Sequence, residues 1–182
     1  MAPTGGIDAM LLGAALSGMF FAIVALATTR HLGSLTAWAI AGFLWTLVVI
    51  ALVTLLPTDA DVGIVPAEGR ATTCSTDIGG PAPEGFWVLA GGQRTLNTLL
   101  FIPAGALLVL GASRWRIGWV LVPLGLAGLA AYSVLIELTQ LELARIDRAC
   151  DLTDVIDNVS GAVVGVGIGL VLMLLFRPWR HR

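Results

Sequence analysis

Three groups of polar side chains interrupt the apolar second half of the sequence, and their spacing suits chemistry. Arg94 and Asn97 are three residues apart, so they share one face of a helix. Ser133, Glu137 and Gln140 follow one another at intervals of four and three residues, which aligns a hydroxyl, a carboxylate and an amide on one helical stripe. Such a set can orient a ligand and transfer a proton.

A third group lies between residues 151 and 169. Asp151, Asp154 and Asn158 fall on one helical stripe. The stripe continues through small residues at four-residue spacing: Gly161, Gly165 and Gly169. Small residues at this spacing let another membrane helix approach closely, so the face that packs against protein is predicted to carry the polar groups too.

The elements that must position these groups are predicted to be membrane helices. Hydrophobic residues make up 57% of the 182-residue chain and charged residues only 12%, whereas a soluble domain carries about 25% charged residues. Five apolar runs approach or exceed the roughly 20 residues that cross a bilayer as a helix. They cover residues 8–28, 35–56, 95–112, 117–138 and 155–176. The sequence therefore predicts a single all-α domain over 1–182, a bundle of five spans with a long loop at 57–93.

The distribution of charge predicts the orientation of the bundle. One set of alternate connections contains arginines and no acid: Arg30, Arg114, Arg116, Arg177, Arg180 and Arg182. All twelve acids fall on the other side. Because arginine accumulates in cytoplasmic connections, we expect the C-terminus in the cytoplasm and the N-terminus and long loop outside.

Cys74 and Cys150 fall on the same predicted outer side. Disulfides persist in oxidising compartments, so this placement predicts a bridge between the long loop and the fourth connection. The alternative is two unpaired thiols.

Glu137 lies within an apolar run, where an ionised group costs roughly 2.5–3.5 kcal/mol at the helix centre. It should therefore have a partner, and Arg94 or Arg148 is the natural candidate. The aspartates have a simpler interpretation as helix caps or a solvated rim, with Thr153 or Asp154 capping free N–H groups.

Taken together, the polar groups resemble the signature of the VanZ-like family. The matching blocks are Arg94-x-x-Asn97-x-x-x-Phe101-x-Pro103-x-Gly105, then Ser133-x-x-x-Glu137-x-x-Gln140, then Arg148-x-x-Asp151-x-x-Asp154-x-x-x-Asn158-x-x-Gly161. The resemblance is strongest over 94–169, and Ala104 stands where many relatives have a bulky aromatic. It implies a multi-pass protein of the bacterial plasma membrane with a role in the cell envelope. The founding member is associated with teicoplanin resistance, and the family implies no particular reaction.

The first functional hypothesis is an outward-facing site that binds or modifies an anionic envelope molecule, such as a glycopeptide or a lipid-linked wall precursor. Arg94 and Arg148 would hold the anionic group, since the planar guanidinium suits phosphate and carboxylate. Glu137 and Asp154 are the candidate catalytic carboxylates. The remaining candidate ligand contacts are Asn97, Ser133, Gln140, Asp151 and Asn158.

Other hypotheses stay open. Glu137, Asp151 and Asp154 could instead bind Mg²⁺ or Ca²⁺, although we predict no metal or cofactor. The cluster could specify helix assembly in a non-enzymatic protein, or a homo-oligomer formed through the glycine stripe could form a transport site. His31 and His181 lie on the predicted cytoplasmic side, which disfavours a Ser-His-Asp hydrolase outside. Nucleic-acid binding is disfavoured because the few cytoplasmic arginines are juxtamembrane.

Overall fold

The structure is a computed structural model that describes residues 6–56, 73–76, 78, 92–142 and 150–176. The described residues form five helices: α1 (Ile7–Leu32), α2 (Ser34–Leu55), α3 (Gln93–Ala112), α4 (Gly118–Glu142) and α5 (Leu152–Phe176). All five are long and apolar enough to cross a membrane. Within those ranges the only sheet-like pairing is an isolated bridge between Ser75 and Asp151. The predicted all-α bundle of five spans is confirmed.

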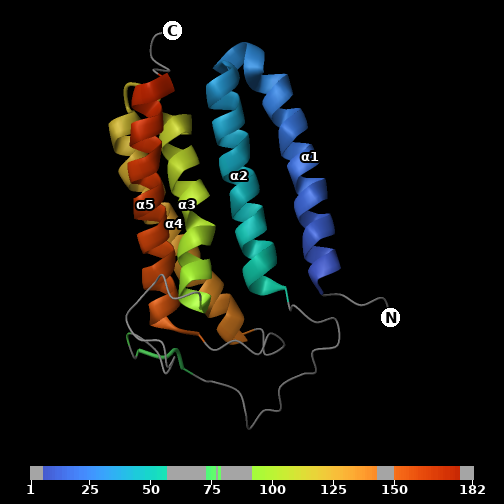
Figure 1. The fold of residues 1–182 in the computed structure, drawn as a ribbon, viewed down its shortest axis with the longest axis vertical. Helices are drawn as coiled ribbons and strands as arrows, with labels where there is room; N and C mark the ends of the chain where they lie inside the picture. Colours follow the sequence, from blue (N-terminus) through green and yellow to red (C-terminus); the bar gives the residue numbers. More distant parts are fainter. Residues whose placement is uncertain (1–5, 57–72, 77, 79–91, 143–149, 177–182) are drawn as a thin grey trace.

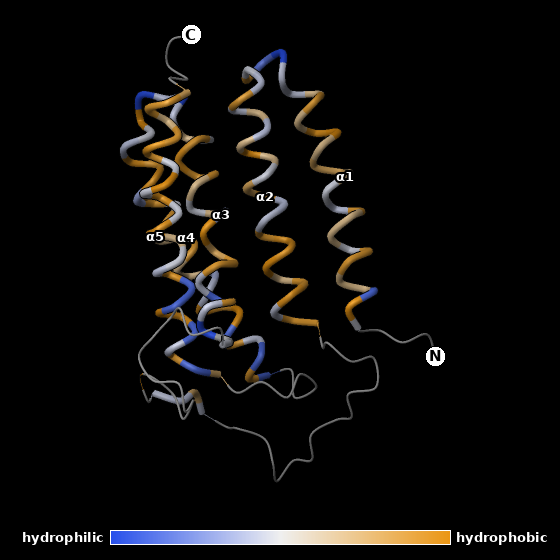
Figure 2. Tube along the Cα trace, viewed as in Figure 1, coloured by the Kyte–Doolittle hydropathy of each residue, from blue (hydrophilic) through white to orange (hydrophobic). Residues whose placement is uncertain are grey.

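The helices run side by side, with α3, α4 and α5 grouped together and the α1–α2 hairpin beside them (Figure 1). We call the end of the bundle that holds Cys74 and Cys150 the disulfide end; α2 and α4 finish there, and α3 and α5 begin there. Figure 2 shows apolar colours along the spans and hydrophilic colours at helix ends, with a concentration at the disulfide end of α3, α4 and α5.

The first helix is one turn longer than predicted and ends at Leu32. Arg30 and His31 extend it because cations are favourable at the negative end of the helix dipole. Gly33 alone joins α1 to α2, with a φ of 76° and a ψ of 151° that are essentially restricted to glycine. The guanidinium of Arg114 donates to the carbonyl of Leu32 and ties the α3–α4 connection to this turn.

The boundaries around the polar groups also differ from the prediction. Helix α4 continues past residue 138 to Glu142, and α5 begins at Leu152 instead of residue 155. The Asp151 carboxylate accepts a hydrogen bond of 2.8 Å from the backbone N–H of Thr153. A side-chain acceptor placed just before a helix satisfies one of the unpaired N–H groups of the first turn, so Asp151 is the N-cap of α5.

Helix α3 lies at the centre of the packing. Half of its span is buried, against 28% or less for each of the other four. Phe101 and Ala104 of α3 are fully buried in the hydrophobic core with Ile50 of α2 and Ile136 of α4. Ala104 thus occupies a position of the core where α3 meets its neighbours.

The backbones of α3 and α5 approach each other along the glycine stripe. A Cβ atom on each glycine would collide with an α3 carbonyl: that of Thr98 for Gly161, Ile102 for Gly165 and Ala106 for Gly169. Backbones come this close only where side chains are absent. Because α3 of the same chain covers the stripe, a homo-oligomer would have to use another surface.

Replacing Gly165 with alanine is expected to destabilise the bundle by about 1–3 kcal/mol, the usual cost of overpacking. The added Cβ would meet the Ile102 carbonyl, which is backbone and cannot rotate away. Gly167→Ala is the matched control, because a Cβ at Gly167 has no neighbour within 4 Å. Unfolding in mixed micelles measures both variants. Equal stability of the two would contradict the close approach of α3 and α5.

Candidate functional site

An ion pair between Arg94 and Asp157 joins α3 to α5 at the disulfide end. Nε of Arg94 lies 2.8 Å from Oδ2 of Asp157, and Nη2 lies 2.9 Å from Oδ1. The side chains are 19% and 2% exposed, respectively. Asp157 lies four residues before Gly161 on α5, and Arg94 lies four residues before Thr98 on α3. Because Gly161 packs against the Thr98 carbonyl, the ion pair lies one helical turn further along the same α3–α5 contact. The bidentate geometry is the strongest form of an arginine–carboxylate contact.

Arg94 was one of two candidate partners for Glu137, but the hydrogen bonds of its guanidinium go to Asp157. Arg148, the other candidate, lies outside the described residues. The physical reason is that α3 packs most closely on α5, so the first turn of α3 faces Asp157 and not the stripe on α4.

The polar stripe of α4 faces the interior of the bundle. Ser133 is fully buried, and its Oγ accepts a hydrogen bond of 2.9 Å from Nδ2 of Asn158 on α5. Gln140 is 4% exposed, and its Nε2 donates to the carbonyl of Thr54 on α2 at 2.9 Å. Two polar residues on the same stripe therefore bind two different helices.

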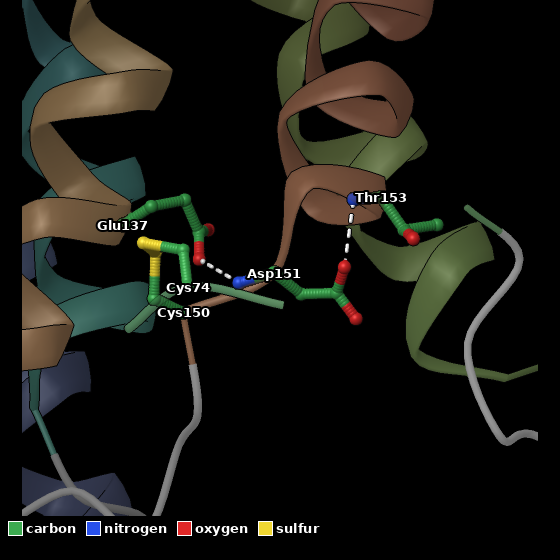
Figure 3. Close-up of a disulfide and its surroundings, with 5 residues drawn as sticks. All are labelled: Cys74, Glu137, Cys150, Asp151 and Thr153. Atoms are coloured by element: carbon green, nitrogen blue, oxygen red, sulfur yellow. Dashed lines mark hydrogen bonds between the residues drawn. A yellow bond between two sulfur atoms is a disulfide. The ribbon is translucent and has the colours of Figure 1, made fainter. Parts of the chain in front are cut away.

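Glu137 lies between these two residues and is 4% exposed. Its Oε2 accepts a hydrogen bond of 3.1 Å from the backbone N–H of Asp151. Figure 3 shows the Glu137 carboxylate directed toward this amide and beside the disulfide. A buried carboxylate at this position fixes the start of α5 relative to α4.

The predicted disulfide is present and links Cys74 of the long loop to Cys150, which immediately precedes Asp151. Ser75 adds two backbone hydrogen bonds: its N–H donates to the Cys150 carbonyl, and its carbonyl accepts from the N–H of Leu152. The described loop segment is thus attached to the first residues of α5, where Glu137 also binds.

We call the following residues the polar cluster: Arg94, Ser133, Glu137, Gln140, Asp157 and Asn158. Three of its buried polar atoms have no hydrogen-bond partner among the described residues: Nη1 of Arg94, Oε1 of Gln140 and Oδ1 of Asn158. An unsatisfied buried polar atom costs about 1–3 kcal/mol. The cluster therefore contains one donor group and two acceptors whose hydrogen bonds the described residues do not supply.

The comparisons with known proteins give one match. The model of the VanZ/LLP1 family matches residues 43–176. The chain belongs to the VanZ/LLP1 family. The VanZ/LLP1 match begins within α2 and extends through α5, so it includes every helix that contributes to the polar cluster and leaves α1 outside. Searches of curated proteins and of solved structures gave no match.

The remaining predicted residues of this VanZ/LLP1 protein are divided among several environments. Asn97 is buried in the first turns of α3, and Asp154 is half-buried on the first turn of α5. Asp151 acts as the helix cap. In the described part of the chain, no three side chains of the His, Cys, Asp and Glu types could hold a metal ion together. Among the described residues, Glu137, Asp151 and Asp154 are thus not gathered into such a group.

Sequence reasoning missed Asp157, which is the residue that binds Arg94. A signal for it was present, because Asp157 lies four residues before Gly161 and so begins the glycine stripe of this VanZ/LLP1 protein. The role of Thr54 had no such signal, because it contributes a backbone carbonyl that any residue would supply.

Proposed function

We propose that this VanZ/LLP1 protein lies in the bacterial plasma membrane with its disulfide end outside, and that the polar cluster there binds an anionic group of an envelope molecule. Two observations support this orientation. The disulfide requires an oxidising compartment, and at the opposite end Arg30 lies in the last turn of α1 while Arg114 and Arg116 lie in the α3–α4 connection.

The observation that carries the proposal is the set of unpartnered atoms in the cluster. Asp157 uses the Nε and Nη2 atoms of Arg94, which leaves Nη1 free to donate to an oxygen of a phosphate or carboxylate. Oδ1 of Asn158 and Oε1 of Gln140 require hydroxyl or amide donors. A network that only joined helices would gain by satisfying these atoms internally.

The carboxylates near Arg94 determine which ligands the polar cluster can bind. Asp151 and Asp154 act electrostatically on Arg94 in addition to Asp157, so the described carboxylates in and around the polar cluster outnumber its one arginine. A ligand that offers both an anionic oxygen and hydroxyl or amide donors suits this field better than a bare anion. Glycopeptides and lipid-linked wall precursors combine these groups. If a reaction follows binding, Glu137 and Asp154 are the candidate catalytic carboxylates.

A deletion strain tests the proposal through its sensitivity to teicoplanin and other envelope-active compounds. We expect wild type to restore the phenotype and Arg94→Gln, Glu137→Gln and Asp154→Asn to fail at matched membrane levels. Asp8→Asn is the control, because Asp8 is exposed and lies at the start of α1, outside the cluster. Full complementation by all three of these variants would contradict the proposed site.

A structural role for the cluster is the second candidate, and the bidentate Arg94–Asp157 pair favours it. Exchanging the two residues, in the variant Arg94→Asp/Asp157→Arg, separates the two candidates. The exchange keeps an ion pair between α3 and α5. It moves the guanidinium from α3 to α5, away from the position at which the proposed anionic ligand would bind. A stable protein that fails to complement supports binding, whereas a stable protein that complements supports the structural role.

A further inference from the structure

A group of basic side chains lies at the end of the bundle opposite the disulfide end. Arg30 and His31 belong to the last turn of α1, and Arg114 and Arg116 belong to the α3–α4 connection. We call these four residues the arginine patch. Every acid that the structure describes lies nearer the disulfide end: Asp8, Glu137, Glu142, Asp151, Asp154 and Asp157. The patch therefore has no acidic neighbour among the described residues.

One hydrogen bond joins the two segments of the patch. The guanidinium of Arg114 donates to the carbonyl of Leu32, and a Cβ atom placed on Gly33 would lie 3.2 Å from Nη1 of Arg114. The α3–α4 connection therefore contacts the α1–α2 turn. Arg30 lies two residues before Leu32, and Arg116 lies two residues after Arg114. The Cα atom of each is thus within about 7 Å of a residue that makes the bond.

The outer two arginines of the patch are available to a ligand. Arg30 and Arg116 are exposed, and neither side chain has an ion pair or a hydrogen bond to another described residue. Arg114 differs, because it is half-buried and already bound to Leu32. A planar guanidinium is well suited to phosphate oxygens. Two free guanidinium groups, one on each of two segments in contact, can therefore bind one phosphate diester.

Exposed tryptophans place the patch at the depth of lipid head groups. Trp115 lies between the two arginines of the α3–α4 connection, Trp119 lies at the start of α4, and Trp38 lies one turn into α2. All three side chains are exposed and lie at the same end of the bundle as the patch. Tryptophan accumulates where membrane meets water, because its ring is apolar and its N–H is polar. The patch therefore faces the phosphates of one leaflet.

We infer that an anionic phospholipid of the phosphatidylglycerol class binds at the arginine patch, with its phosphate shared by Arg30 and Arg116. Phosphatidylcholine carries the same phosphate together with a quaternary ammonium, which the patch repels, so the patch selects the anionic lipid. The inference goes beyond the proposed function, because the polar cluster lies at the other end of the bundle.

A lipid bound in this way attaches α1 to the rest of the protein. Helix α1 packs chiefly on α2 and lies outside the residues that the family model matches. Arg30 belongs to α1, whereas Arg116 lies within the matched residues. A phosphate shared by the two arginines thus adds a contact between α1 and the α3–α4 connection. Each juxtamembrane arginine is expected to increase the affinity for an anionic lipid about fivefold.

Photo-crosslinking of the full chain tests the inference. The protein is placed in phosphatidylcholine vesicles that contain a small fraction of phosphatidylglycerol with a diazirine near its head group, and the crosslinked peptides are mapped. The comparison uses phosphatidylcholine with the same diazirine at the same fraction. We expect phosphatidylglycerol to label the α1–α2 turn and the α3–α4 connection at least about fivefold more. Equal labelling by the two lipids would overturn the inference.

Two single variants show whether the two segments share one lipid. Arg30→Gln should reduce labelling of the α3–α4 connection about fivefold, and Arg116→Gln should likewise reduce labelling of the α1–α2 turn. Both residues are exposed, so neither variant disturbs the packing. Arg30→Lys is the matched control, because it keeps the charge and should label more strongly than Arg30→Gln. If each variant lowers labelling of its own segment only, the shared site is wrong.

Glycerol phosphate in the buffer distinguishes a lipid site from a site for soluble phosphates. Salt screens exposed charges, so glycerol phosphate and sodium chloride at equal ionic strength should reduce the labelling equally. A greater reduction by glycerol phosphate would mean that the patch binds soluble phosphates, and it would overturn the assignment to a lipid.

Discussion

Replacing Asp157 with alanine is expected to lower the free energy of unfolding by about 3–5 kcal/mol, the usual cost of removing one partner of a buried ion pair. We expect the lower part of this range, because Arg94 is 19% exposed and retains some access to water. Nη1 of Arg94 already lacks a partner among the described residues, so the variant would leave the whole guanidinium unpaired. Unfolding of the purified protein in mixed lipid–detergent micelles measures the loss.

The double variant Arg94→Ala/Asp157→Ala shows why Asp157→Ala loses stability. It distinguishes the cost of leaving Arg94 charged and unpaired from the cost of losing the contact between the two side chains. Replacing both members of a buried pair by apolar groups is often nearly neutral, so the double variant should be more stable than Asp157→Ala alone. Asp8→Ala serves as the control for a lost carboxylate at an exposed position near the same end. The ion pair has no structural role if Asp157→Ala is as stable as Asp8→Ala.

Removing the disulfide, in the variant Cys74→Ala/Cys150→Ala, is expected to cost about 4 kcal/mol on the chain-entropy model. The bridge joins residues 76 apart in sequence and encloses α3 and α4. Without it, the unfolded chain gains conformational freedom. In the folded state, Ser75 is no longer held covalently beside the Cys150 carbonyl and Leu152 N–H to which it hydrogen-bonds.

Reductant provides the matched comparison for the disulfide variant. Wild type treated with a thiol reductant should unfold with the same midpoint as the double variant, and reductant should leave the variant unchanged because no other cysteine is present in the chain. Gel mobility with and without reductant reports whether the bridge has formed. An untreated wild type that unfolds together with the variant would show that the bridge contributes nothing to stability.

The pattern of apolar residues was sufficient to predict the five spans. Each span contains a nearly continuous apolar run, and the bilayer requires every backbone group in such a run to be satisfied within its own helix. The grouping of Cys74 and Cys150 on one side follows from the number of spans between them. The ends were less accurate: α1 extends through Arg30 and α5 begins at Leu152, because caps and end charges stabilise residues that hydropathy excludes.

Helical spacing also indicated which polar residues share a face of a helix. It did not indicate which other helices that face contacts. It placed Ser133, Glu137 and Gln140 on one stripe, and the structure buries all three. The partners come from different elements: Asn158 on α5 for Ser133, and the Thr54 carbonyl on α2 for Gln140.

Only the tertiary structure decided that Arg94 binds Asp157. A helix repeats locally and so fixes which of its own residues are neighbours, whereas contacts between helices depend on their rotation and relative height. Here the glycine stripe sets both, because the backbone of α3 fits against Gly161, Gly165 and Gly169 in a single register. That register brings Arg94 opposite Asp157, and no local sequence pattern contains the information.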